Sequence, residues 1–310
     1  SRIFIVAIPS IEYSNVLLHT ILSHEVGHRV ADKFLGQEDQ EQLIEYINTL
    51  VGHDLSWWDP DIKGKGPLWE YQARQSLFKT IFQARNFALH ELISDLVAYH
   101  LCGISALFAI DEFSSPDVLD VLPDYNSGFY PPWRFRIRQL VDIAYSEELP
   151  DIVKKIRGVN PVNLIIERTL KRLERLRNIA NETSDLDQIR ANPLIEKAYR
   201  DIPQVMEKGL AYVRSELPTF RFSNEKLVSE LPLLLERLSL GIPPDSLETS
   251  LPDIRSAIAA GWLYRTARLK IPNKDSELWE AKDDEILNRL VLKAIETIQL
   301  TRDFQKYQNT

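Results

Sequence analysis

The sequence is poor in the residue types that mark several classes of protein. It has one cysteine, Cys102, in 310 residues, so no disulfide can form within the chain. A disulfide framework of the secreted kind is therefore excluded, and a reducing, cytoplasmic location is expected. Glycine is also scarce, at 11 residues, while Leu, Glu, Lys and Arg are plentiful. This composition favours helices over a barrel or a sandwich.

Long apolar runs and excess positive charge are missing as well. The longest nearly apolar stretch, 96–110, contains His100 and is shorter than the roughly 20 residues that span a bilayer, so it is expected to be core and no membrane span is expected. The N-terminal residues do not follow a signal-peptide pattern. The net charge of −8 argues against general binding of nucleic acid, although Arg134, Arg136 and Arg138 leave room for a local basic patch.

Periodicity and helix breakers predict a mainly α (α+β) protein. The β-branched run Ile3–Ile8 is expected to be a strand. A small N-terminal strand or sheet and a helical domain are expected over 1–148, and an all-helical region over 149–310 that packs on it or forms a second domain. Helices are predicted over 16–35, 40–50, 70–109 with a break near Gly103, 132–147, 161–180, 184–200, 202–216, 224–239, 250–269 and 276–306.

The sequence HEVGH at 24–28 places two histidines and a glutamate on a predicted helix. His24 and His28 are four residues apart and share one face, so both imidazoles can bind one zinc ion at about 2.0–2.1 Å. Glu25 lies about 100° further round the helix, where it can reach a metal-bound water. Two ligands and a general base are what metal-assisted hydrolysis requires.

Two observations favour a buried site over a chance pattern on a polar helix surface. Gly27 lies inside the helix, where glycine costs about 1 kcal/mol relative to alanine, and its small size allows a close backbone approach. His24 and His28 also share the apolar stripe of Leu17 and Ile21 and should therefore face inward. Two buried histidines need polar partners.

A third ligand is predicted in the segment HELISDLVAYHL at 90–101. Glu91 and Asp95 lie four residues apart within an otherwise apolar helix, and buried carboxylates without a partner are costly. We expect Glu91 to bind the metal and Asp95 to accept the second ring N–H of a ligand histidine. The alternative is that Glu91 pairs with Arg136 or Arg85.

These motifs together resemble the gluzincin metallopeptidases, which include the thermolysin-like enzymes. In that clan HExxH is followed by a helix carrying Glu-x-x-x-Asp, with the Glu as ligand, and His24, Glu25, His28, Glu91 and Asp95 match this pattern position by position. The resemblance implies a zincin-like fold. The gap between the motifs is longer than in thermolysin, which suggests that the loop 53–68 is an insertion.

A second resemblance is carried by YPPWRFRIRQL at 130–140. It is similar to the HPPxxxRIxxL segment of the membrane metallopeptidases that process prenylated proteins and of their heat-shock relatives. Tyr130 replaces the family's His, whose role there is to stabilise the transition state, and a tyrosine can also donate a hydrogen bond to an oxyanion. Arg136 is expected either to orient a carboxylate of the site, to bind substrate, or to be structural or solvated.

The sequence thus predicts a zinc endopeptidase with one Zn²⁺ and a protein or peptide substrate. Ile3–Ile8 is the candidate edge strand for substrate pairing, and the Trp57–Trp58 loop is the candidate lid. The helical second half is a possible dock for a regulatory protein partner. The alternatives are a catalytically inactive zincin-fold regulatory or protein-binding module, a metallohydrolase of non-peptide substrates, and a helical protein with chance motifs.

Overall fold

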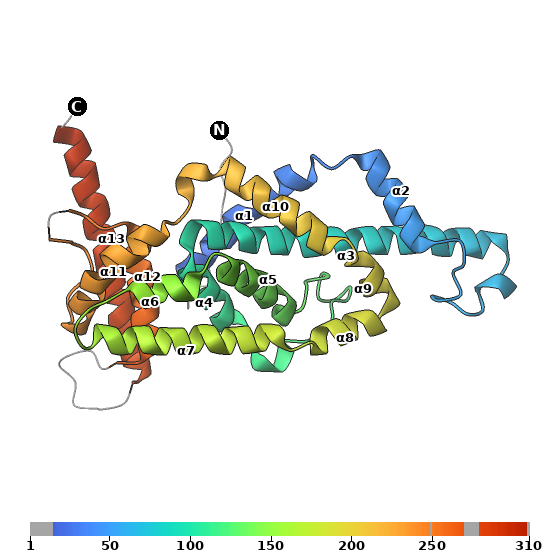
Figure 1. Ribbon diagram of the computed structural model, residues 1–310. Helices are drawn as coiled ribbons and strands as arrows, with labels where there is room; N and C mark the ends of the chain where they lie inside the picture. Colours follow the sequence, from blue (N-terminus) through green and yellow to red (C-terminus); the bar gives the residue numbers. More distant parts are fainter. Residues whose placement is uncertain (1–14, 249, 270–278, 309–310) are drawn as a thin grey trace.

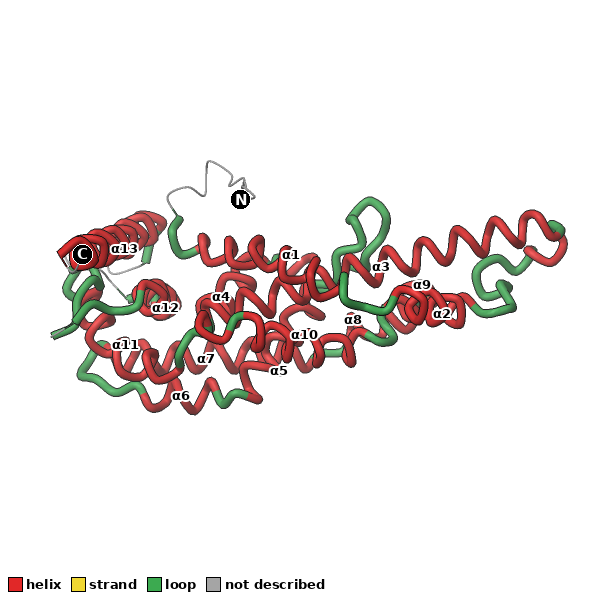
Figure 2. Tube along the Cα trace, turned by 90° about the horizontal axis from the view of Figure 1, so that it is seen from above, coloured by secondary structure: helices red, strands yellow, loops and turns green. Residues whose placement is uncertain are grey.

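The computed structural model describes residues 15–248, 250–269 and 279–308, and within these ranges the protein consists of helices and loops without a strand (Figure 2). The mainly α class is therefore confirmed for the described part of the chain. The predicted strand Ile3–Ile8 lies outside the described residues. No helix in the described ranges has the length and apolar character needed to cross a membrane.

The N-terminal helices follow the predicted pattern closely. A 3-10 turn, η2 (Leu18–Ile21), leads into α1 (Leu22–Leu35). The next helix is α2 (Gln40–Val51). Its N-cap is Asp39, whose side chain accepts hydrogen bonds from the backbone N–H groups of residues 41 and 42. Such a cap satisfies amide groups that have no partner in the first turn. A loop containing η3 (Ile62–Gly64) then connects to the next helix.

The longest element of the first half is α3 (Pro67–Cys102), which begins with proline as its first helical residue. It ends at Gly103, which has φ 55°, and α4 (Ile104–Phe113) follows directly. A Cβ at Gly103 would also lie 2.7 Å from Cδ1 of Phe222, so both backbone and packing require glycine there. The predicted break in the helix is thus confirmed. The N-terminal part of α3 extends beyond the rest of the helical body (Figures 1 and 2).

Of the remaining helices, α5, α9 and α10 pack directly on α3, whereas α7, α11, α12 and α13 pack mainly on one another and on the shorter helices. One of them, α6, was not predicted, and the predicted helix over 184–200 is split at Asn192, which caps α9. The bounds are η4 (Pro116–Val118), α5 (Trp133–Ser146), α6 (Leu149–Lys155), α7 (Val162–Asn181), α8 (Ser184–Ala191), α9 (Pro193–Ala198), α10 (Ile202–Glu216), η5 (Pro218–Phe220), α11 (Asn224–Ser239), α12 (Ile254–Ala267) and α13 (Ala281–Gln308).

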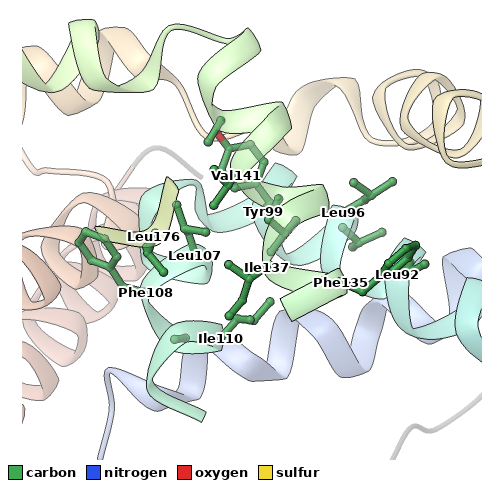
Figure 3. Packing of buried hydrophobic residues seen from close by; sticks show 14 of the residues in the cluster. Leu92, Leu96, Tyr99, Leu107, Phe108, Ile110, Phe135, Ile137, Val141 and Leu176 are labelled. Atoms are coloured by element: carbon green, nitrogen blue, oxygen red, sulfur yellow. The ribbon is translucent and has the colours of Figure 1, made fainter. Parts of the chain in front are cut away.

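One hydrophobic core runs through both halves of the chain. Figure 3 shows members of this cluster of buried side chains from three helices: Leu92 and Leu96 of α3, Ile137 and Val141 of α5, and Leu176 of α7. The cluster continues into α11, α12 and α13. Buried residues from both sides of residue 148 therefore belong to one core.

Candidate metal centre

A close contact between α1 and α3 forms the base of the candidate site. A Cβ added at Gly27 of α1 would lie 2.6 Å from Cα and 2.8 Å from the carbonyl oxygen of Ser94 on α3. Atoms cannot approach so closely, so only glycine permits this separation of the two backbones. The predicted close approach at Gly27 is thus present, and it brings the HEVGH segment against the segment that carries Glu91 and Asp95.

The Nδ1 atoms of both histidines are occupied by hydrogen bonds to α3. His24 Nδ1 lies 2.8 Å from Oδ1 of Asp95, and His28 Nδ1 lies 3.0 Å from Oγ of Ser94. The Ser94 hydroxyl donates its own proton to the carbonyl oxygen of His90 at 2.7 Å, so Ser94 must accept from His28. Both rings therefore carry their proton on Nδ1 when neutral, which leaves the lone pair on Nε2 free.

The free Nε2 atoms point to one carboxylate. His24 Nε2 lies 3.4 Å from Oε2 of Glu91, and His28 Nε2 lies 3.7 Å from Oε1. Ligand atoms held about 2.0–2.1 Å from a tetrahedral zinc ion lie about 3.4 Å from one another. The three side chains are therefore spaced as a zinc ligand set would be.

Glu25 lies beside these side chains but is exposed to solvent. One carboxylate oxygen of Glu25 and one ring nitrogen each of His24 and His28 all lie within 4.8 Å of one another. These three residues form a possible metal cluster by themselves. Glu91 is buried and lies 3.4 and 3.7 Å from the two Nε2 atoms, so it remains the candidate third ligand, whereas the exposed Glu25 remains the candidate general base.

Arg136 of α5 is buried and holds the two carboxylates of α3. It donates to both oxygens of Asp95, at 2.8 and 2.7 Å, and its Nη1 lies 3.2 Å from Oε2 of Glu91. Its guanidinium group also stacks on Trp133 at 4.5 Å. Among the predicted roles of Arg136, orienting the carboxylates is the one that these contacts support, and the solvated alternative is excluded.

The alternative prediction, that Glu91 pairs with Arg136 or Arg85, holds for Arg136 only. Glu91 lies close to Arg136 as well as to the histidines. Arg85 takes no part, because it binds Glu38 and Asp201 instead. With neutral imidazoles, the carboxylates of Glu25, Glu91 and Asp95 and the guanidinium of Arg136 leave a formal charge of −2. Two imidazoles and a carboxylate around this negative charge suit a divalent cation such as Zn²⁺.

Burial and the neighbouring charges shift the pKa values of the two histidines in opposite directions. Burial by itself would lower the pKa of His24, but the hydrogen bond and charge of Asp95 and the contact with Glu91 raise it to about 9. Burial, followed by the charge of His24, lowers the pKa of His28. In the metal-free protein a proton on His24 therefore supplies positive charge between Asp95 and Glu91.

Asp95 remains ionised although it is completely buried. Burial tends to raise the pKa of this carboxyl group, but the charge of Arg136 and the hydrogen bond from His24 lower it to about 2. An ionised Asp95 is the acceptor that fixes the His24 ring in its Nδ1–H form.

Tyr130 lies at the edge of the site, in the loop before α5. Its side chain is half exposed, and no hydrogen bond of its hydroxyl group is found within the described residues. The nearby Glu91 carboxylate, together with partial burial, raises the pKa of Tyr130. The hydroxyl group therefore keeps its proton at neutral pH and is available as a donor.

The predicted lid lies elsewhere. Arg74 of α3 binds the backbone carbonyl groups of Gly52 and His53 and holds the loop there. Arg74 precedes Glu91 by 17 residues, which corresponds to about 25 Å along the helix axis. Trp57 donates to the carbonyl oxygen of Val51 at 3.4 Å. The Trp57–Trp58 pair therefore does not cover the site in this arrangement.

Arg134, Arg136 and Arg138, which left room for a local basic patch, all pair with carboxylates. Arg134 pairs with Asp120 and Glu182, and Arg138 pairs with Asp185. With Arg136 bound to Asp95, all three arginines point to carboxylates and do not form a free cationic surface. His100 lies outside the site and is part of the core, as expected. Its Nε2 atom lies 2.8 Å from the carbonyl oxygen of Leu217.

Ser94 was missed from the sequence, because a serine between Glu91 and Asp95 has no distinctive spacing. Gly27 was the relevant signal in the sequence for a close contact at this point, since a glycine inside a helix suggests close approach to another backbone. It does not indicate which helix supplies that backbone.

No protein-family model, curated protein or solved structure matches the chain. Its function must therefore be argued from the geometry of the site.

Proposed function

We propose that the protein is a zinc-dependent endopeptidase with a gluzincin-like site. The observation that carries this proposal is the convergence of two Nε2 lone pairs and the Glu91 carboxylate on one position, with each Nδ1 atom already bound to α3. His24, His28 and Glu91 would hold the ion. A bound zinc ion would act as a Lewis acid and lower the pKa of a water molecule towards neutrality.

The residues behind the ligands serve to position them. Asp95 and Ser94 accept the Nδ1–H groups of His24 and His28, and Arg136 bridges Asp95 and Glu91. Such partners fix the ring orientation and increase ligand basicity. Asp95 accepts hydrogen bonds from both His24 and Arg136, which preorganises this part of the site before a metal or substrate arrives.

In the proposed reaction Glu25 moves the proton. It accepts a proton from the water whose oxygen bonds to the peptide carbonyl carbon, and it donates that proton to the amine as the C–N bond breaks. The Tyr130 hydroxyl group donates to the oxyanion, in keeping with its raised pKa and its lack of a partner within the described part of the chain. Both groups are solvent-exposed, so a peptide can reach them.

The test is a comparison of metal content and cleavage in the whole chain. Purified wild-type protein is expected to contain one zinc per chain and to cleave a peptide library. Glu25→Gln should keep the zinc and lose at least about a hundredfold in kcat, as expected for loss of a general base. Glu207→Gln, a change of an exposed glutamate on α10, should alter neither quantity.

Three other outcomes would overturn the proposal. Folded wild-type protein without affinity for zinc would exclude a metal site. Zinc binding without cleavage of any library peptide would favour a regulatory or protein-binding module. Turnover of a non-peptide ester or amide alone would favour a different metallohydrolase.

A further inference from the structure

A cavity of about 570 Å³, away from the candidate metal centre, is lined by six cationic side chains from α7 and from the C-terminal end of α12. Its walls also include carboxylates of α4 and α13. The cationic lining residues are Arg168, Lys171, Arg172, Arg175, Arg265 and Arg268, and the acidic ones are Asp111, Glu112 and Asp284. The lining thus has a formal charge of +3, in a chain whose net charge is −8. Such a concentration of positive charge requires an explanation.

The cations of α7 form one face of that helix. Residues 168, 171, 172 and 175 are spaced by three or four positions, so their side chains project on the same side. Like charges at this spacing destabilise a helix by a few tenths of a kcal/mol per pair. Four cations on one helix face repel one another in solvent. A bound anion beside this face would offset that repulsion.

The floor of the cavity is rigid. Arg172 is mostly buried and donates to Asp111 at 2.8 and 2.6 Å and to the Thr266 hydroxyl at 2.9 Å. Its guanidinium group also lies 4.3 Å from the ring centre of Phe108. Asp111 accepts from Arg175 as well, so this buried carboxylate is shared by two guanidinium groups and its charge is fully compensated.

Several cations of the lining have no carboxylate partner within the cavity. Arg168 donates to the carbonyl oxygen of Ala267, and Lys171 pairs with Glu167, which does not line the cavity. Arg268 forms no ion pair with any residue that the structure describes. Arg265 binds Glu112 and Asp284, but its buried Nη1 atom has no hydrogen-bond partner among the described residues. Within the described residues, the Arg268 guanidinium group and the Nη1 atom of Arg265 are therefore the donors of the lining that have no acceptor.

The arrangement favours a small anion over a large one. Arg172 and Arg265 are mostly buried, whereas Arg175 and Lys171 are 59 % and 70 % exposed and stand where solvent has access. The volume is within the range of small-molecule sites, roughly 300–1,000 Å³. Guanidinium groups match phosphate oxygens in pairs of parallel hydrogen bonds.

We propose that this cavity binds a small polyphosphate, of the pyrophosphate or nucleotide polyphosphate class. Several phosphate oxygens would be needed to satisfy the excess donors, and a polyphosphate offers them within a few ångströms. The cavity shares no residue with the candidate metal centre, so the inference does not depend on peptidase activity.

The experiment is calorimetric titration of the whole chain with inorganic pyrophosphate and with ATP at constant ionic strength. Saturable binding of at least one is expected. The double variant Lys171→Gln/Arg268→Gln should weaken it at least tenfold, because both side chains lack a carboxylate partner in the cavity. The matched control Arg190→Gln/Lys208→Gln removes the same two charge types from α8 and α10 and should leave the affinity unchanged.

A second measurement separates binding from damage to the fold. Pyrophosphate should raise the melting temperature of wild type and control but not of the double variant, and circular dichroism should show equal helicity in all three. The single variant Arg175→Gln, at a largely exposed position, should weaken binding by a smaller factor. Absence of saturable binding, equal affinity in the double variant and the control, or binding of a glutamate-rich peptide but of neither phosphate compound would overturn the proposal.

Discussion

Gly27 is the residue on which the geometry of the candidate metal centre depends most directly. In Gly27→Ala the new methyl group would meet the Ser94 backbone at 2.6 Å, and backbone atoms of a packed helix cannot move aside easily. We expect a loss of about 1–3 kcal/mol in the free energy of unfolding, as for other overpacked sites. Zinc affinity should fall as well, because Glu91 moves away from both histidines.

Denaturant unfolding and zinc titration would check this expectation. Gly64→Ala is the matched control, since a Cβ at Gly64 has no atom within 4 Å. Equal stability and equal zinc affinity of the two variants would show that the close approach at Gly27 has no consequence.

Ser94 tests the assignment of the histidine tautomers. Ser94→Ala removes the acceptor of the His28 Nδ1–H group but leaves the ligands in place. Loss of such a partner usually lowers metal affinity by about 10- to 100-fold. Competition with a chelator of known affinity would measure the change, with Ser229→Ala on α11 as the control. An unchanged affinity would mean that Ser94 does not fix the ring.

At the scale of single elements, the N-cap of α12 is Asp253, and its negative charge should contribute to the free energy of unfolding. The Asp253 side chain accepts from the backbone N–H of Arg255 and from the side chains of Arg255 and Lys226. Burial tends to raise the pKa of Asp253, but these hydrogen bonds and charges bring it well below its usual range. The folded state therefore favours the ionised form of this carboxyl group.

Asp253→Asn should lower the free energy of unfolding by about 1–2 kcal/mol at pH 7, because it removes a charged partner of two cations while retaining a capping oxygen. A depressed pKa stabilises the folded state above the unfolded value of about 3.9 and loses this effect as the pH falls. The difference between wild type and variant should consequently shrink below about pH 4. Urea unfolding at several pH values checks this, and a difference that grows in acid would contradict it.

Helix positions were largely predictable because their determinants are local. Gly103 ends α3 where the sequence predicts a break, and α10 and α11 have the predicted bounds. The split at Asn192–Pro193 and the short helix α6 were missed, since each depends on a few residues within a longer helical pattern. The same locality limits the prediction of the site. Spacing places His24 and His28 on one face, but the register of α1 against α3 is set by long-range packing.

The whole molecule combines the candidate metal centre with one core that both halves of the chain share. The proposed ligands, their partners and the proposed general base all precede residue 148, while α9 and α10 from the second half pack against α3. The role expected for the second half, as a dock for a partner, stays a prediction. Its packing suggests that it also stabilises the helices that carry the site.

Removal of the metal should therefore affect the stability of the whole protein. Without a cation, Glu91 and Asp95 remain buried near each other with Arg136 and a protonated His24 as their only compensation among the described residues. Zinc binds the folded state only if the ligands are assembled, so it shifts the folding equilibrium by mass action. At a free zinc concentration 100 times the Kd, the gain should be about 2.7 kcal/mol.

Thermal unfolding with and without a chelator measures this effect. Wild type and Glu25→Gln should both melt at a higher temperature with zinc, because Glu25 is not assigned as a ligand. Glu91→Gln should lose most of the gain, since its neutral amide is a weak zinc ligand and leaves one negative charge fewer at the site. A gain that disappears in Glu25→Gln but persists in Glu91→Gln would instead place the ion among His24, Glu25 and His28, the cluster on α1 alone. The comparison of these two variants thus decides whether the ion joins α1 to α3 or is held by a single helix.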